Sequence, residues 1–396
     1  MRRVFSMAVA DASTPGRAAC RFFSAEQAEI LALKAEVARL QSAGGGGSTN
    51  VDDTRSSIVV VGGGRMGEIR CRDIMSSPRA SLAGFVDHDV TARDSFAGRY
   101  GCNSFATLEQ ALISAPAAKG VWVSIPSHMH KEAILLAASH GKHVAVEKPV
   151  TMSEADTARC YEACERAGVH LHCAFQRRTD PAYQAVAAEV AAGNLGAITS
   201  IHAIFRDHPC PPMEFLLAGG DVFHDLATHD IDFILSLLGG ELPSEVYARG
   251  ASMEPMLKKA GVMDTATVVL GFPSGLNVSM ELSRNASYGY DQRLEVFGSN
   301  GNMCAVENSH KVPMVAGNSA GIHRSGLSYS FPDRFREAYE SELDLFADII
   351  EGKATPKVTS HDAVMASRIA EAALQSALKG IPIKLDTAKV PEVAAA

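Results

Sequence analysis

A glycine-rich turn between two apolar segments constrains this chain more than any other feature. The β-branched run 58–61 (IVVV), typical of a buried parallel strand, leads directly into residues 62–67 (GGGRMG), which fit the pattern G-x-G-x-x-G. A helical segment follows, and the apolar segment 82–86 ends at Asp87, twenty residues after Gly67. This context is what a dinucleotide-binding βαβ unit requires, and it argues against the alternative of a glycine-rich turn without a ligand.

Each residue type in this unit has a physical reason to be there. Gly62 permits a tight turn, Gly64 lets the backbone approach a pyrophosphate at the helix N-terminus, and Gly67 allows close helix–strand packing. Asp87 is expected to accept hydrogen bonds from the ribose hydroxyls and to repel a 2′-phosphate. We therefore predict NAD rather than NADP.

The alternation of strands and helices continues downstream. Strands are predicted at 120–124, 143–146 and 169–173, with helices at 128–139 and after Ser153. This rhythm predicts a doubly wound parallel sheet that binds ligands at the carboxyl ends of its strands. Two strand ends, at Ser124-Ile125-Pro126 and Glu147-Lys148-Pro149, are expected to face the cofactor, although a Lys-Pro can also be a simple structural stop. The predicted cofactor-binding set is Gly62, Gly64, Arg65, Met66, Gly67, Asp87, Ser124, Pro126, His130, Glu147, Lys148 and Gln176.

A second candidate site lies at the start of an apolar helix that runs to Leu238. Asp225 and His229 are spaced i,i+4, which places them on one face of an α-helix. A carboxylate one turn from an imidazole can orient the ring and stabilise its charged form, which suits a general base. The alternative is an ordinary helix N-terminus with acids favoured by the dipole, and it explains Asp221 better than His229.

A metal site is not expected here. His224 and His229 are five residues apart, so they diverge by about 140° around a helix. The sequence also has no HExxH pattern and no cysteine cluster. We therefore predict no metal in the site.

The rest of the chain predicts a second domain. Strand-like segments at 199–206, 245–249, 265–272, 276–282, 293–297 and 302–306 include a hairpin turn at 273–275 (PSG), and helices are expected at 181–192, 337–351 and 362–378. The predicted fold is α/β, with an N-terminal Rossmann domain over 57–175 and a C-terminal α+β domain with a mostly antiparallel open sheet over 176–385. The aromatic-rich segment 331–339 is interpreted as core, with pocket lining as the alternative.

The first 56 residues form an extension of different composition. Residues 1–23 carry four arginines and one acid, which is typical of a mitochondrial transit peptide, although a disordered tail with chance arginines fits too. Residues 24–42 have an apolar seam at Ile30, Leu33, Val37 and Leu40, which suits either a weak oligomerisation helix or a docked surface helix. The segment 44–48 (GGGGS) is a flexible linker.

Composition excludes several classes of partner. The formal net charge of −8 argues against a nucleic-acid binder. No apolar run approaches the roughly 20 residues that cross a bilayer, so no membrane partner is expected. Eight cysteines without a CxxC pair indicate reduced thiols of an intracellular protein. Its compartment is the cytoplasm, or the mitochondrial matrix if the extension is a transit peptide.

Residues 57–385 resemble the Gfo/Idh/MocA (glucose–fructose oxidoreductase / inositol dehydrogenase) family. The resemblance is carried by the glycine fingerprint 62–67, by Glu147-Lys148-Pro149, and by a D-x-x-x-H helix at 225–229. Two further stretches, 206–220 and 288–298, are similar to the inositol 2-dehydrogenase branch. Asp221 departs from the small or aliphatic residue usual after the paired glycines, which leaves the substrate open.

The resemblance implies roles for named residues. Lys148, Asp225 and His229 would form the catalytic set, with His229 as base, Lys148 on the substrate oxygen and Asp225 on a substrate hydroxyl or the His229 ring. His208 and Tyr288 would join these three in binding the substrate. The family also implies a homo-oligomer, a dimer or tetramer, formed through the outer face of the second sheet.

The implied activity is NAD-dependent oxidation of a secondary alcohol of a cyclic polyol. Myo-inositol, oxidised at C2 to 2-keto-myo-inositol (scyllo-inosose), is the first candidate substrate. A related sugar, another inositol isomer or a trans-dihydrodiol is the alternative within the family. A non-catalytic NAD-binding regulator is the alternative from another class, and the presence of all three catalytic residues argues against it.

Overall fold

The computed structural model describes residues 54–386 except 219, 313 and 320. The predicted transit peptide, seam helix and linker therefore lie outside the described residues. From Thr54 onward the chain belongs to one compact unit. Within the described ranges, no helix combines the length and the apolar character needed to span a membrane.

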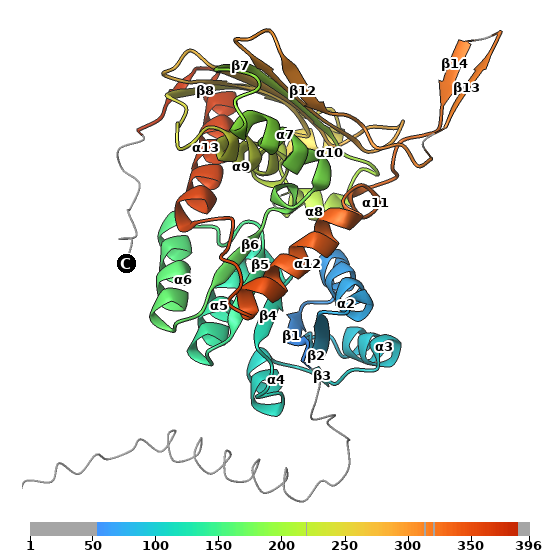
Figure 1. Ribbon diagram of the computed structural model, residues 1–396, viewed down its shortest axis with the longest axis vertical. Helices are drawn as coiled ribbons and strands as arrows, with labels where there is room; N and C mark the ends of the chain where they lie inside the picture. The colour runs from blue at the N-terminus through green and yellow to red at the C-terminus, as the bar shows by residue number, and fades with distance from the viewer. Residues whose placement is uncertain (1–53, 219, 313, 320, 387–396) are drawn as a thin grey trace, which may run out of the picture. The chain divides into compact units, whose positions relative to one another are not determined.

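Residues 54–175, the first half, are built on a six-stranded parallel sheet with strand order β3-β2-β1-β4-β5-β6 (Figure 1). This order confirms the predicted doubly wound Rossmann sheet. The strands are β1 (Ser56–Val61), β2 (Ala80–Val86), β3 (Ser104–Phe105), β4 (Gly120–Val123), β5 (His143–Glu147) and β6 (Leu171–Ala174). The helices are α2 (Arg65–Ser76), α3 (Val90–Tyr100), α4 (Leu108–Ser114), η1 (Ser127–Met129), α5 (His130–Ser139) and α6 (Glu154–Arg166).

Residues 176–386, the second half, are built on a seven-stranded sheet with strand order β12-β11-β7-β10-β9-β8-β15. Only the β7–β10 pair of this sheet is parallel, which confirms the mostly antiparallel prediction, and β9 and β10 pair across the predicted 273–275 turn. Its strands are β7 (Ile198–Arg206), β8 (Glu245–Ala251), β9 (Thr265–Gly271), β10 (Asn277–Ser283), β11 (Asp291–Gly298), β12 (Met303–Val306) and β15 (Ile383–Lys384). The helices are η2 (Gln176–Arg178), α7 (Pro181–Ala191), α8 (Met213–Leu217), η3 (Val222–Ala227), α9 (Thr228–Leu237), α10 (Pro255–Ala260), α11 (Phe331–Arg334), α12 (Arg336–Ile350) and α13 (Ser360–Lys379).

One face of the second sheet is covered by helices, with α13 packed on β8 and α9 and η3 packed on α13 (Figure 1). A separate hairpin, β13 (Val315–Asn318) with β14 (Gly321–Arg324), projects away from this sheet in the same view. The hairpin was not predicted. Its residues are exposed on both strands, so they show none of the buried alternation that marks a strand in sequence.

Helix α12 crosses back from the second half to cover the first sheet (Figure 1). Its Phe346 packs edge-on against Trp122 of β4, at 5.3 Å between ring centroids. Its Glu342 accepts a 2.6 Å hydrogen bond from the buried Arg70 of α2. Helices α4 to α6 cover the opposite face, so the two faces of the first sheet are closed by segments far apart in the sequence.

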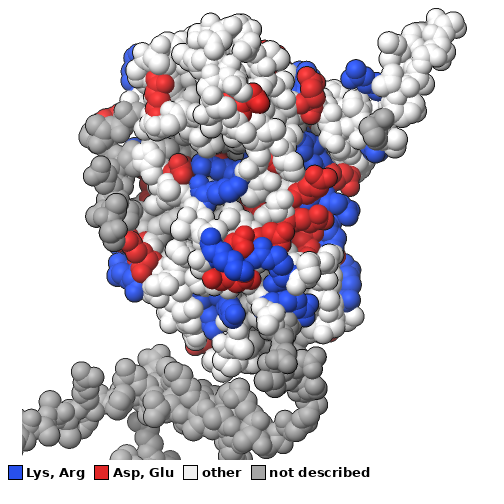
Figure 2. All heavy atoms as spheres, viewed as in Figure 1, with Lys and Arg blue, Asp and Glu red and all other residues white. Residues whose placement is uncertain are grey.

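Surface ion pairs also hold α12 to the first half. Arg79, just before β2, pairs with Asp348 at 2.5 Å and with Glu351 at 3.2 Å. Figure 2 shows acidic and basic side chains side by side across the middle of this face. Such exposed pairs contribute little each, so the buried contacts of Phe346 and Glu342 dominate the docking of α12.

Candidate active site

The glycine turn packs as tightly as the fingerprint predicts. Gly62 has φ 103°, and a Cβ there would lie 2.6 Å from the carbonyl oxygen of Ser124. A Cβ on Gly67 would lie 1.8 Å from the carbonyl oxygen of Gly62, so only glycine lets α2 approach β1 this closely. Gly64 differs, because a Cβ there would meet nothing within 4 Å.

The N-terminus of α2 is open toward the space beside Gly64. Gly64 is the N-cap, and no side chain caps the helix. The first N–H groups, at the positive end of the helix dipole, are therefore free to bind an anion. Asp87 lies beside this turn, because its carboxylate accepts hydrogen bonds from the N–H groups of Gly63 (2.7 Å) and Asp89 (2.9 Å). Ser124 Oγ is buried nearby without a partner among the described residues. An open helix N-terminus, an adjacent acid and an unpaired hydroxyl fit NAD.

A cavity of about 960 Å³ extends from this turn and is lined by both halves of the molecule. Most of the predicted cofactor set lines it: Arg65, Met66, Ser124, Pro126, His130, Glu147, Lys148 and Gln176. Asp225 and His229 line the same cavity, together with Phe331 and Tyr339 of the aromatic-rich segment. Phe335 of that segment is buried in the core, so the segment both packs in the core and lines the cavity.

Two members of the predicted cofactor set are already engaged within the protein. His130 is 1% exposed, and its ring nitrogens lie 2.8 Å from the carbonyl oxygen of Ile125 and 2.9 Å from that of Pro149. The ring therefore ties together the loops after β4 and β5, and its contact with the cofactor stays a prediction. Glu147 Oε1 accepts hydrogen bonds from Arg70 and from the indole N–H of Trp122.

The second predicted site begins with a π-helical turn, η3, before α9 continues as an α-helix. Asp221 caps this turn, accepting hydrogen bonds from the N–H groups of Phe223 (2.8 Å) and His224 (3.0 Å). The interpretation of Asp221 as an acid at a helix N-terminus is thereby confirmed. Its second oxygen lies 2.9 Å from His224 Nδ1. Burial alone would lower the His224 pKa, but Asp221 and Glu371 raise it above its ordinary value.

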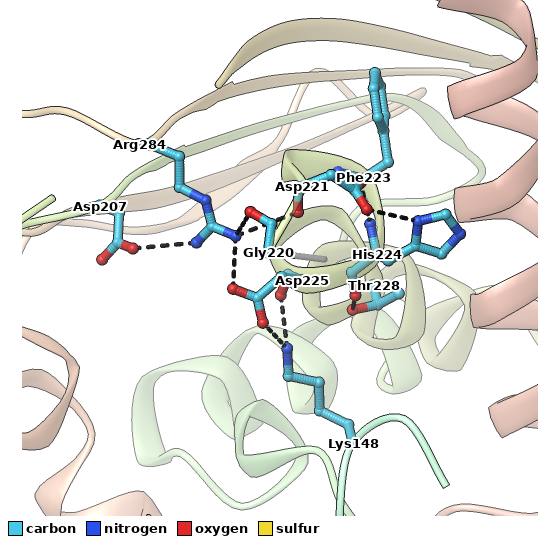
Figure 3. A network of polar contacts seen from close by, with 9 residues as sticks. All are labelled: Lys148, Asp207, Gly220, Asp221, Phe223, His224, Asp225, Thr228 and Arg284. Carbon is cyan, nitrogen blue, oxygen red and sulfur yellow. Dashed lines mark hydrogen bonds and ion pairs between the residues drawn. The ribbon is translucent and has the colours of Figure 1, made fainter. Parts of the chain in front are cut away.

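Asp225 is held between two cations, as Figure 3 shows. Lys148 Nζ donates to Asp225 Oδ1 at 2.6 Å and to its carbonyl oxygen at 2.8 Å, while Arg284 Nη2 donates to Oδ2 at 2.7 Å. Burial opposes ionisation of this carboxyl, but Lys148 and Arg284 outweigh it and hold the Asp225 pKa well below its usual range. Asp225 is therefore a carboxylate at every physiological pH.

Arg284 was missed by the sequence analysis. It follows β10 directly and is 2% exposed. Its guanidinium also donates to the carbonyl oxygens of Gly220 (2.5 Å) and Asp221 (3.2 Å) and to the carboxylate of Asp207 (3.3 Å). A single arginine after a strand has no local pattern that predicts these long-range contacts.

His229 lies in the cavity wall without a hydrogen-bond partner among the described residues, and its Nδ1 is buried. Burial lowers its pKa well below the ordinary value, and the nearby cations Lys148, Arg177 and Arg284 lower it further. The imidazole is therefore neutral. The carboxylate oxygens of Asp225 bind the two cations, Oδ1 on Lys148 and Oδ2 on Arg284, and do not hold the His229 ring. Of the two partners considered for Asp225, the substrate hydroxyl stays a prediction.

His208 and Tyr288, predicted to bind substrate, do not line this cavity. The His208 ring packs edge-on against Tyr329 at 4.9 Å between centroids. Tyr288 is 52% exposed, and its hydroxyl bonds Arg206 and Asp291 beside a different pocket. Tyr290, which is buried, lines the cavity in its place.

Metal-binding geometry is not seen in the described ranges, where no group of three or more His, Cys, Asp or Glu side chains converges on a metal position. The cysteines of these ranges are free thiols.

The chain matches two family models. Residues 56–175 match the oxidoreductase family with an NAD-binding Rossmann fold (GFO_IDH_MocA), and residues 183–304 match the GFO/IDH/MocA C-terminal domain. A myo-inositol 2-dehydrogenase of Thermotoga maritima is 32% identical over 82% of this chain and 96% of that relative. A scyllo-inositol 2-dehydrogenase (NAD(+)) of Bacillus subtilis is 31% identical over 82% of this chain and 94% of that relative.

A solved structure is also similar to this chain in fold. Scyllo-inositol dehydrogenase from Lactobacillus casei, with bound NAD(H) and scyllo-inositol, superposes with a TM-score of 0.77 at 25% identity. The match covers 83% of this chain and 99% of that chain.

Proposed function

This chain belongs to the Gfo/Idh/MocA family of NAD-binding oxidoreductases, and we propose that it oxidises a secondary alcohol of a cyclic polyol. The observation that carries the proposal is one cavity whose wall contains Arg65 and Met66 of the glycine turn together with Lys148, Asp225 and a neutral His229. Myo-inositol, oxidised at C2 to 2-keto-myo-inositol, is the first candidate substrate.

The cofactor is held by the first half of the molecule. In this proposal the N-terminus of α2 binds the pyrophosphate, Asp87 the adenosine ribose, and Ser124 Oγ a polar group of the dinucleotide. Bound NAD supplies the acceptor for the hydride that leaves the alcohol carbon. The strand-end loops after β4 and β5, fixed to each other through His130, shape the wall at which this transfer occurs.

His229 is the general base. A neutral imidazole can take the hydroxyl proton, and the buried position of Nδ1 leaves Nε2 as the nitrogen that meets the substrate. The cations around the ring disfavour the imidazolium, so the proton passes on readily after each turnover. The lowered pKa keeps the base active in mildly acidic solution.

Lys148 stabilises the charge that develops on the substrate oxygen. Its ammonium has three N–H donors, and Asp225 occupies two of them through its carboxylate and carbonyl oxygens. The third donor is left for the substrate, in a direction that the two contacts to Asp225 fix. A preoriented cation at the position of a developing alkoxide lowers the barrier without reorganisation.

The choice among inositol isomers rests on hydrogen bonds to the remaining hydroxyls. Relatives at about the same identity include both a myo-inositol and a scyllo-inositol enzyme, so other inositol isomers, sugars and trans-dihydrodiols stay as alternative substrates. Tyr290 lines the cavity and replaces His208 and Tyr288 as the candidate contact. An unpaired buried polar group is costly, which gives such a wall its selectivity.

The test is NADH formation, followed at 340 nm, with a panel of inositol isomers, aldoses and dihydrodiols. Turnover with an inositol and weak turnover with aldoses supports the proposal. If the folded protein binds NAD but oxidises none of these compounds, the regulator alternative replaces it.

Two further expectations stay proposals. We expect a dimer or tetramer in solution, to be measured by light scattering, and an intracellular compartment, to be tested by microscopy of the tagged full-length chain. An intact Met1 in protein from the source cells would contradict import through a cleaved transit peptide.

A further inference from the structure

We propose that Arg284 is the positioning residue of this site, acting through Asp225 on the ammonium of Lys148 and through its charge on His229. The inference rests on the proposed function, since it assigns the orientation of the same catalytic groups. It adds a residue that is remote in sequence from every motif of the site.

Arg284 connects three segments of the described site through its guanidinium. Its guanidinium lies where three segments meet: the end of β7 at Asp207, the turn before η3 at Gly220 and Asp221, and Asp225 within η3 (Figure 3). The planar fork of an arginine can make these contacts together, whereas a lysine ammonium is a point charge. Arg284 therefore fixes the first turn of the catalytic helix against the second sheet.

The contact to Asp225 sets the direction of its carboxylate. Arg284 holds Oδ2 at 2.7 Å, so Oδ1 is turned toward Lys148, which it meets at 2.6 Å. Without Arg284 the carboxylate is free to rotate, and Lys148 keeps only the carbonyl oxygen of Asp225 as a fixed acceptor. The third ammonium donor would then no longer point in one direction.

The charge of Arg284 acts on His229 as well. Four charged groups act on this ring from the elements around it: Lys148 after β5, Arg177 in η2, Arg284 after β10, and Asp225 in η3. Three are cations and one is an anion. The charges of Lys148 and Asp225 oppose each other, so the net positive charge near the ring comes from Arg177 and Arg284. Replacing Arg284 with a neutral residue leaves only Arg177 of these two. The imidazolium then becomes easier to form.

Two substitutions separate geometry from charge, and a third provides the control. R284Q removes both the charge and the fork, while R284K keeps the charge but cannot make all the contacts at once. The control is R206Q, because Arg206 lies on the same sheet and pairs with Glu281 and Asp291 but does not line the cavity. All three variants are made in the full chain, and their kcat and pH profiles are compared with those of the wild type in the presence of NAD.

For R284Q we expect kcat to fall about 100-fold, the effect of misplacing a reacting group by about 1 Å, while the Kd for NAD stays within about twofold. The acidic limb of the kcat profile should move up by about one pH unit. R284K should restore the wild-type limb but recover only part of kcat. R206Q should match the wild type in both. A folded R284Q with kcat within threefold of the wild type overturns the proposal, as does an unmoved acidic limb.

If R284Q does not fold, D207N and R284K carry the test, because D207N loosens one anchor of Arg284 and leaves its charge. We expect kcat to fall about tenfold in each, and wild-type kcat in both contradicts a positioning role.

A second readout does not depend on the substrate. The titration of His229 can be followed by NMR with 13C-labelled histidine, using H229N to assign the signal. A higher midpoint in R284Q than in the wild type supports the proposal, and identical titrations refute it. This measurement stands even if the wild type oxidises no polyol, in which case the proposed function alone fails.

Discussion

Two glycines three positions apart in the cofactor turn allow packing to be separated from ligand binding. Gly67 and Gly64 both belong to the fingerprint, but a Cβ on Gly67 would lie 1.8 Å from the carbonyl oxygen of Gly62, whereas one on Gly64 would meet nothing within 4 Å. The backbone of Gly64, at φ −71° and ψ −177°, accepts alanine without strain. Alanine at each position therefore tests a different requirement.

The expected magnitudes follow from these distances. In G67A the helix α2 must move by about 1.5 Å, which we expect to cost about 3 kcal/mol as backbone overpacking, offset by about 1 kcal/mol of helix propensity. In G64A the fold should be unchanged or more stable by about 0.5 kcal/mol. Its methyl group nevertheless stands where the pyrophosphate is proposed to bind, so the Kd for NAD should rise at least tenfold, or about 1.4 kcal/mol.

Urea unfolding followed by far-UV circular dichroism measures the first quantity, and isothermal titration with NAD measures the second. G67A should shift the unfolding midpoint down and weaken NAD binding as well. G64A should weaken NAD binding alone. Wild-type NAD affinity in G64A would refute the placement of the pyrophosphate at this helix N-terminus, and a wild-type midpoint in G67A would refute the packing argument.

Three further substitutions test the rest of the site. H229N should lower kcat about 1000-fold and leave the Kd for NAD nearly unchanged, and equal losses in kcat and NAD affinity would contradict the role of His229 as base. The wild-type rate should stay constant below pH 6.5, because only the neutral imidazole is active and burial lowers the pKa of His229. D87S should shift the ratio of kcat/KM for NAD over NADP toward NADP about tenfold, and an unchanged ratio would remove Asp87 from the ribose. Y288F should leave the KM for polyol within about twofold, since its side chain lies outside the cavity; a large rise would restore the predicted contact.

Much of the fold could be predicted because its signals are local. Strands β1 and β2 are short, largely apolar runs, and the glycines and Asp87 follow them at fixed spacing. The two-residue strand β3 carries no such pattern and was not predicted. The destination of α12 could not be predicted in this way. Its amphipathic pattern shows that one face is buried but not that Phe346 meets Trp122 of the first half.

The candidate site was predicted in its residues but not in its contacts. Lys148, Asp225 and His229 do line one cavity, but the sequence did not show that the two carboxylate oxygens of Asp225 bind Lys148 and Arg284. Arg284 becomes visible only when β10 and η3 are brought together. Tyr290, in the loop that also carries the exposed Tyr288, is the residue that reaches the cavity.

The return of α12 to the first sheet has a consequence for synthesis of the chain. Proteins leave the ribosome N-terminus first, and domains commonly fold as they emerge. Here the cofactor-binding sheet emerges early, but the face that carries Trp122 is covered only when residues 336–350 have been made. Until then α2 and α3 cover only part of that face, and the apolar surface that Leu343 and Phe346 later cover stays exposed. The nucleotide-binding half therefore stays incompletely packed while residues 176–335 are being translated.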